Sequence, residues 1–166
     1  LGEHFNDVTL DSFAVGNATV PGEPLSVRMT YRVQGYGQVM GEMMYIEPGF
    51  FHAMRSNPFQ RQDRDFPVDF AFGRISMEEV LVRLPEGFRI LEAPRPTIAR
   101  LGGIKFVAAC QLKDGALQYQ RRYQRKAVRF AVSQYAELRE VFGRIISSDK
   151  GQVVLTSRPV APPTDG

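Results

Sequence analysis

The feature that most constrains this chain is a repeated alternation of apolar and polar residues over short segments, broken by glycine and proline. Residues 25–33 show it best: Leu, Val, Met, Tyr and Val occupy every second position, with Ser, Arg, Thr and Arg between them. Successive side chains of a β-strand point to opposite faces, so this segment predicts a strand with one buried face. The 15 glycines and 11 prolines of the chain supply the turns between such segments. The pattern predicts a mostly β protein built from antiparallel strands.

The alternating segments predict about nine or ten strands. We expect them over residues 5–10, 25–33, 38–46, 66–70, 74–84, 88–91, 104–112, 116–126, 128–132 and 152–157. Turns are expected at 35–37, 85–87, 102–103 and 113–115. Residues 38–46 are the expected antiparallel partner of 25–33, and residues 11–24 are expected to be a loop. Within 74–84 the apolar positions change phase at Glu78 and Glu79, which indicates two alternating stretches with a slip between them.

The period changes after Ser133. Over residues 134–148 apolar side chains recur every three or four positions, which predicts an amphipathic helix with one broad apolar face. Ser133 is the expected N-cap, because its hydroxyl can accept a hydrogen bond from an unpaired amide of the first turn. We expect residues 1–157 to form a single β-sandwich domain, jelly-roll-like or alternatively immunoglobulin-like, with this helix near its C-terminus. The proline-rich residues 158–166 are expected to be a flexible tail.

Residues 47–65 do not alternate, and they predict a long ordered loop. A loop of this length is unusual in a compact domain and is a candidate for a functional role. The candidate interaction surface that it suggests consists of Phe50, Phe51, His52, Phe59 and Arg64. The phenylalanines are the expected anchors for a partner, and the alternative is that they pack beneath their own loop.

The net charge of +3 is unevenly distributed, since residues 1–60 sum to −3 and residues 61–166 to +6. The densest basic cluster consists of Arg121, Arg122, Arg125, Lys126 and Arg129. Aromatic residues interleave with this cluster, as they do in nucleic-acid-binding surfaces. On a strand, however, these basic side chains would be divided between both faces, as on a polar edge or surface strand. We favour the surface strand and expect no nucleic-acid partner.

The sequence offers no recognisable arrangement of catalytic residues. The one cysteine, Cys110, lies mid-strand among Val, Ala and Leu residues, where cysteine usually acts as a small buried hydrophobe. The two histidines, His4 and His52, show none of the usual zinc-ligand spacings. We therefore expect no catalytic residue, no metal site and no cofactor. An independent enzyme that uses His52, Asp69 or Glu79 is the alternative.

The chain shows no sign of a membrane-spanning segment, because no apolar run approaches the roughly 18 residues that a spanning helix needs. It begins with Leu1 and has no basic-then-apolar signal pattern. We expect it to be one part of a longer protein.

The order of several short motifs resembles a known family. The motifs are Pro24-Leu25, Gly41-Glu42, Tyr45-Ile46, Asn57-Pro58-Phe59, RDFPVDF over 64–70, LPEGF over 84–88, a Gly-Gly hairpin, YAELR over 135–139 and VVL over 153–155. Their order and spacing over residues 24–157 resemble the C-terminal β-domain of bacterial transglutaminase-like proteins. Proteins of that kind combine an N-terminal β-domain, a central papain-like transglutaminase core and this C-terminal domain.

The resemblance implies a non-catalytic accessory role. The family's catalytic Cys, His and Asp lie in the central core, and no position of this sequence matches them, so Cys110 is not the implied nucleophile. The implied partner is the transglutaminase-like core of the same chain, together with a protein or cell-wall substrate. The resemblance also implies an exported bacterial protein, periplasmic or extracellular.

A second interpretation is a β-sandwich module that binds carbohydrate or the cell wall. Such a module would line a groove with aromatic side chains, and here Phe50 and Phe51 would supply them. The absence of tryptophan weakens this alternative.

Overall fold

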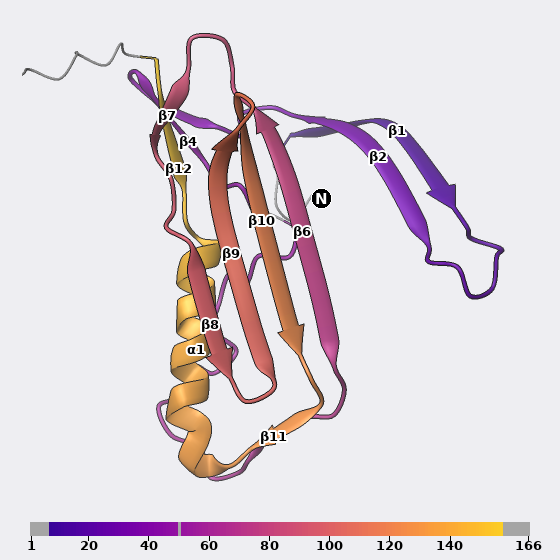
Figure 1. Ribbon diagram of the computed structural model, residues 1–166, viewed down its shortest axis with the longest axis vertical. Coiled ribbons are helices and arrows are strands. Elements are labelled where there is room, and N and C mark those ends of the chain that lie inside the picture. Colours follow the sequence, from indigo (N-terminus) through magenta and orange to yellow (C-terminus); the bar gives the residue numbers. More distant parts are fainter. Residues whose placement is uncertain (1–6, 50, 158–166) are drawn as a thin grey trace, which may run out of the picture. The chain divides into compact units, whose positions relative to one another are not determined.

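The computed structural model describes residues 7–49 and 51–157 and divides the chain into two compact units, Leu1–Gln38 and Val39–Gly166. The described residues form twelve β-strands, a short 3₁₀ helix and one α-helix (Figure 1). The strands are β1 (Val8–Gly16), β2 (Ser26–Val33), β3 (Gln38–Met40), β4 (Met43–Ile46), β5 (Val68–Phe70), β6 (Arg74–Arg83), β7 (Arg89–Glu92), β8 (Thr97–Leu101), β9 (Ile104–Lys113), β10 (Ala116–Arg125), β11 (Val128–Phe130) and β12 (Val153–Thr156). The helices are η1 (Val132–Gln134) and α1 (Tyr135–Asp149).

The predicted fold class is confirmed. The sheets are antiparallel, and α1, the one α-helix of the described residues, lies near the C-terminus and agrees with the helix predicted over 134–148. The jelly-roll and immunoglobulin-like topologies are not established by the strand order and stay predictions, as does the single-domain organisation over 1–157. The predicted tail, 158–166, lies outside the described residues.

The first unit contains the hairpin of β1 and β2. A β-bulge between Leu10 and Ser12 shifts the register of this pair. The extra residue brings Leu10 and Phe13 to the same face, although three positions separate them in the sequence. The bulge interrupts the alternation and so hides the second half of β1, and two predictions are wrong. Residues 11–24 are not a loop throughout, since β1 continues to Gly16, and β2 pairs with β1 instead of with 38–46.

Residues 38–46 form two short strands, β3 and β4, in place of one. The turn between them contains Gly41, whose φ of +61° is a conformation that favours glycine. Both strands belong to a sheet with the order β3-β4-β12-β7. In its inner strand β12, Val153 and Leu155 are completely buried, which makes this short strand part of the interior.

The largest sheet has the order β6-β10-β9-β8, and every neighbouring pair in it is antiparallel. Tight turns join β8 to β9 and β9 to β10, as predicted. Gly102, Asp114 and Gly115 in these turns all have positive φ, which short hairpin loops commonly require. A further two-stranded sheet pairs β11 with β5.

Two predictions about the largest sheet are wrong. β6 runs from Arg74 to Arg83 in one continuous register, without the slip predicted at Glu78 and Glu79. β10, which carries much of the basic cluster, is an inner strand with neighbours on both sides, so the expected polar edge strand is wrong. Its outward side chains, such as Gln120 and Arg122, are exposed, as expected of a surface strand. Each strand places one charged side chain in the interior, Glu78 in β6 and Arg121 in β10. The positions of the apolar residues alone therefore do not show which side chains of these two strands point inward.

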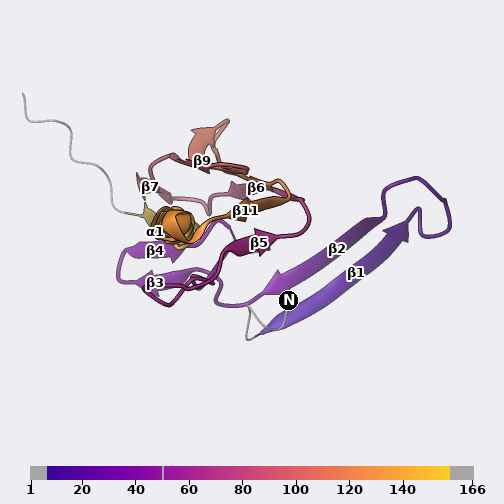
Figure 2. The same cartoon turned by 90° about the horizontal axis from the view of Figure 1, so that it is seen from below.

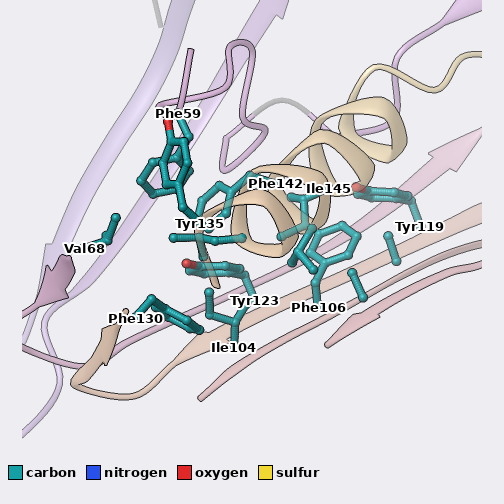
Figure 3. Close-up of a cluster of buried hydrophobic side chains, with 14 residues drawn as sticks. Phe59, Val68, Ile104, Phe106, Tyr119, Tyr123, Phe130, Tyr135, Phe142 and Ile145 are labelled. Atoms are coloured by element: carbon teal, nitrogen blue, oxygen red, sulfur yellow. The ribbon is translucent and has the colours of Figure 1, made fainter. Parts of the chain in front are cut away.

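Helix α1 covers one face of the largest sheet, and the main core lies between them (Figure 2). Leu138, Phe142 and Ile145 of the helix belong to the same buried cluster as Phe106 and Tyr123 of the sheet. Figure 3 shows Phe142 and Ile145 of the helix facing Phe106 and Tyr123 of the sheet. The helix has an exposed glycine in its interior, so tertiary packing supplies most of its stability.

The helix begins differently from the prediction. Gln134, and not Ser133, occupies the N-cap position of α1, because residues 132–134 already form the 3₁₀ turn η1. The side-chain oxygen of Gln134 accepts a hydrogen bond from the amide of Ala131 at 3.0 Å. The helical segment therefore begins with this 3₁₀ turn and not with a serine N-cap.

Gly49 lets the chain after β4 pass close to the largest sheet. A Cβ atom on Gly49 would lie 2.7 Å from Oη and 2.9 Å from Cε1 of Tyr119, a buried side chain of β10. We expect Gly49→Ala to lower the free energy of unfolding by about 1–3 kcal/mol, because the enclosed ring has little room to move aside. Urea denaturation followed by circular dichroism measures this change.

Gly143→Ala is the matched control. Gly143 is exposed in α1, and a Cβ atom there would meet no other described atom within 4 Å. Because alanine has the higher helix propensity, we expect this change to stabilise the protein by about 1 kcal/mol. Equal stability of Gly49→Ala and the unaltered protein would contradict the close approach at Tyr119.

Candidate interaction surface

A buried ion pair links the largest sheet to the end of the helix. The Arg121 guanidinium donates to both carboxylate oxygens of Asp149, from Nε at 2.7 Å and from Nη2 at 2.8 Å. The two side chains are 1% and 0% exposed. Burial by itself lowers the pKa of Arg121, but the hydrogen bond and the negative charge of Asp149 outweigh it and raise that pKa. Each buried group therefore depends on the other to offset the loss of its hydration.

A second buried carboxylate, Glu78, binds the long loop that follows β4. Its Oε1 accepts a hydrogen bond from the amide of Phe51 at 3.1 Å, and its Oε2 accepts one from the amide of His52 at 3.2 Å. Asp149 Oδ2 accepts a third from the amide of Met54 at 2.7 Å. Two carboxylates from β6 and α1 thus satisfy three backbone N–H groups of one loop, which orders it without secondary structure.

The long loop is confirmed, since residues 47–67 form neither helix nor strand where they are described. One of its predicted surface residues is misplaced, however. Phe59 is only 6% exposed and packs edge to face against Tyr135 and Phe142, with ring centroids 5.9 and 4.9 Å apart. It belongs to the core and cannot anchor a partner, so the prediction that Phe59 is part of the interaction surface is wrong. The alternative, an aromatic residue packed beneath its own loop, holds for Phe59.

The other predicted surface residues have different outcomes. Phe51 is 50% exposed, and His52 and Arg64 are exposed as well. Phe50 lies outside the described residues. Because Glu78 holds the backbone of Phe51 and His52, this end of the loop presents two adjacent side chains in a defined conformation, and Arg64 lies further along the loop.

A larger exposed apolar surface lies on the face of the largest sheet that is turned away from α1 (Figure 2). We call it the outer sheet face, and its exposed apolar side chains are Ile75, Met77 and Leu81 of β6, Val107 of β9 and Ile98 of β8. The three in β6 are 61%, 64% and 61% exposed. Arg122 of β10 pairs with both Met77 and Val107, and Val107 pairs with Ile98. These side chains therefore form one continuous row across all four strands.

A shallow depression of about 580 Å³ lies within the outer sheet face. The residues that line it include Met77, Val107, Ala109, Gln120 and Arg122. Glu79 also borders it and accepts hydrogen bonds from the side-chain amides of Gln118 at 2.7 Å and Gln120 at 3.3 Å. These bonds lower the pKa of Glu79, so this carboxylate stays ionised and held within the face.

The alternation in the sequence does not predict the outer sheet face, because a slip at Glu78 and Glu79 would place the apolar residues of β6 on one interior side. Ile75 and Met77 point outward, whereas Val80 and Val82 share the inner face with the buried Glu78. One continuous strand with an inward Glu78 instead leaves Leu81 outside as well. At these outer positions, alternation alone predicts polar residues exposed to solvent.

The hairpin of the first unit has an apolar face of its own. It consists of Val8, Leu10, Phe13 and Val15 of β1 with Val27, Met29, Tyr31 and Val33 of β2, which the register brings opposite one another. Phe13 pairs with Met29 and is 59% exposed. The opposite face is polar, and there Arg32 forms an ion pair with Asp11 at 2.8 Å. The hairpin is therefore amphipathic.

Cys110 is poorly suited to nucleophilic chemistry. It is half-buried in β9, on the same inner face as its cross-strand neighbour Tyr119. Burial raises the pKa of the Cys110 thiol to about 11, so little thiolate is present at neutral pH. Across residues 7–49 and 51–157, no three His, Cys, Asp or Glu side chains are grouped to hold a metal ion. The same part of the chain contains no helix with the length and apolarity of a membrane span.

Comparison with protein families assigns most of the chain to one type of domain. The model of a domain of unknown function with solved structure (DUF3858) matches residues 42–155. The chain belongs to the DUF3858 family. The match begins just before β4 and ends within β12, so it covers α1 and the strands from β4 onward and leaves β1, β2 and β3 outside. Searches among curated proteins and among solved structures gave no match.

The DUF3858 assignment confirms the coarse part of the resemblance, namely a domain of unknown function with a mostly β fold. It does not by itself connect the chain to transglutaminase-like proteins. The residues that it covers include both buried carboxylates, Glu78 and Asp149, and the whole outer sheet face.

Removing one partner of the buried ion pair should destabilise the DUF3858 domain. We expect Asp149→Ala to lower the free energy of unfolding by about 3 kcal/mol, because it leaves a buried guanidinium and the Met54 amide without this acceptor. Arg55→Met is the control, since Arg55 pairs with Glu47 where both side chains are more than a third exposed. That change should cost less than about 1 kcal/mol. Similar losses in both variants, measured by urea denaturation, would contradict the role of the buried pair.

The burial of Cys110 predicts slow alkylation in the folded DUF3858 domain. At pH 8 we expect iodoacetamide to modify Cys110 roughly two hundredfold more slowly than in the urea-unfolded chain, because the thiolate fraction is that much smaller. The rate in the folded protein should keep rising until the pH approaches about 11. Mass spectrometry of timed samples measures it, and a plateau near pH 8.5 in the folded protein would disprove the burial effect.

Proposed function

We propose that the chain is a non-catalytic interaction domain that packs against a transglutaminase-like core, of the papain-like superfamily, in the same protein. Two observations of the sequence support this. The motif resemblance covers residues 24–157, and the DUF3858 match lies within that range. In this proposal the parent protein is bacterial and exported, and its substrate is a protein or a cell-wall component.

The apolar face of the β1–β2 hairpin is the observation that carries the proposal. A two-stranded hairpin has little stability in water by itself and needs a further surface against its apolar side. Eight apolar side chains make up that side of the hairpin, and Leu10, Phe13 and Val27 are each about half exposed. The hairpin precedes the DUF3858 match in the sequence. An apolar surface of the core would cover this face, and the hairpin is thus the element that attaches the domain.

The chemistry of Cys110 supports the accessory role. A transglutaminase-like reaction needs a cysteine thiolate beside a histidine. The Cys110 thiol has a raised pKa and is half-buried on the inner face of a sheet. In this proposal the reacting groups belong to the core, and the domain contributes position and binding.

Co-expression with the core tests the proposal. The DNA upstream of this segment is read first, and the transglutaminase-like core that it encodes is co-expressed with the chain as a separate, tagged polypeptide. We expect the two to co-purify, and we expect Phe13→Glu to abolish the association because it places a charge in the buried apolar face. Ala14→Glu is the matched control, because Ala14 lies on the opposite face of the hairpin and should leave the association intact.

Two outcomes would reject the proposal. One is an upstream sequence without a Cys, His and Asp core. The other is a core that neither binds the chain nor changes in activity when the domain is deleted. Equal loss of association in Phe13→Glu and Ala14→Glu would remove the hairpin face from the contact.

A further inference from the structure

We propose that the outer sheet face binds an amphipathic helix with acidic flanks, contributed by a partner protein. The residues of this face belong to β6, β8, β9 and β10, and none belongs to the hairpin. The proposal therefore concerns a second surface and can hold whether or not the hairpin attaches the domain to a core.

The dimensions of the outer sheet face fit one helix. The row from Met77 to Ile98 crosses three inter-strand steps of about 4.8 Å, which gives a width of roughly 14 Å. From Ile75 to Leu81 the face extends roughly 20 Å along β6. A helix with its side chains is about 10–12 Å wide and covers 20 Å in roughly 13 residues. Exposed apolar patches of this size on single domains are often functional.

The charges of the outer sheet face select an acidic partner. Its exposed cationic side chains are Arg83 of β6, Arg122 of β10, Lys105 and Lys113 of β9 and Arg100 of β8. Glu79 is the one carboxylate at the outward positions of these strands, and it already accepts hydrogen bonds from Gln118 and Gln120. Arg122 lies within the apolar row and lines the depression. Aspartate or glutamate residues beside the apolar stripe of a helix would meet these cations.

The structure favours a helix on the face over a strand added to the sheet. β6 is an edge strand, but it carries charged residues at both ends, Arg74 and Arg83, and the inward Glu78 at its middle. Such charges are devices that discourage edge-to-edge pairing. An added strand beside β6 would also leave Val107 and Ile98 uncovered, because they lie two and three strands away. A helix laid across the face can cover the apolar row.

A protein partner also fits better than a membrane. Surfaces that enter the membrane interface commonly carry tryptophan, tyrosine or phenylalanine among the cations. The outward positions of β6, β8, β9 and β10 carry no aromatic residue. Four of these outward positions instead carry glutamine, namely Gln111 in β9 and Gln118, Gln120 and Gln124 in β10, whose amide groups suit the polar flanks of a peptide.

Binding of a synthetic peptide to the full chain tests the proposal. The probe is a fluorescent helix-forming peptide of about 14 residues with leucines at i, i+3, i+4 and i+7 and glutamates beside them. A comparison peptide has lysine in place of every glutamate. We expect fluorescence anisotropy to show binding of the glutamate peptide, weakening with salt, and roughly tenfold weaker binding of the lysine peptide.

Matched variants locate the site. We expect Arg122→Glu and Met77→Ser each to weaken binding of the glutamate peptide roughly tenfold. Arg64→Glu and Leu112→Ser are the controls and should leave it unchanged. Arg64 lies on the long loop, and Leu112 is 60% exposed but occupies an inward position of β9. All four positions are exposed, so circular dichroism should show the same folded protein in each case.

Three results would overturn the proposal. One is absence of binding by the glutamate peptide, or equal binding of both peptides. Another is equal weakening in the control variants, which would move the site away from the outer sheet face. The third is binding to vesicles of phosphatidylcholine and phosphatidylglycerol that is lost in Arg122→Glu while the peptide does not bind. That last result would assign the face to a membrane surface.

Discussion

The ion pair of Arg121 and Asp149 is the interaction on which the second unit depends most. Burying a guanidinium and a carboxylate costs several kcal/mol for each ion, which only close pairing and further hydrogen bonds can offset. Here the pairing is bidentate, the ring of Phe106 lies 5.1 Å from the guanidinium carbon, and Asp149 also accepts from the amide of Met54. One pair thereby joins an inner strand, the last turn of the helix and a loop 95 residues earlier in the chain.

Much of the fold could be predicted from the sequence wherever a residue's own backbone preference decides the structure. The turns at Gly102 and Gly115, the strand over 25–33 and the helical period after residue 133 are of this kind. The assignments that failed depend on partners distant in sequence. Nothing near Arg121 in the sequence indicates that it pairs with Asp149, so its burial in an inner strand could not be predicted. The loop amides that bind Glu78 likewise lie more than 20 residues before it.

The same buried charges explain why the alternation of apolar and polar residues does not predict the outer sheet face. Glu78 and Arg121 occupy inward positions that alternation reserves for apolar residues, and the outward positions of β6 hold Ile75 and Met77. In the long loop the reverse happens, since Phe59 reaches the core. Exposed apolar side chains therefore lie on a regular strand, and one aromatic residue of the irregular loop belongs to the interior. The order of residue types cannot show which side chains are buried unless the partners of Glu78 and Arg121 are known.

The β-bulge in β1 makes the length of that strand more important than the identity of its residues. Because the bulge shifts the register between Leu10 and Ser12, it alone keeps Leu10 in phase with Phe13 and Val15. Deleting a single residue there would turn the first part of the strand over, so that Val8 and Leu10 would face the polar side. Substitutions that preserve apolar character leave the hairpin's two faces distinct, whereas a one-codon deletion mixes them. Among relatives that keep this hairpin, gaps in the alignment should therefore avoid β1 and collect in the loop before β2.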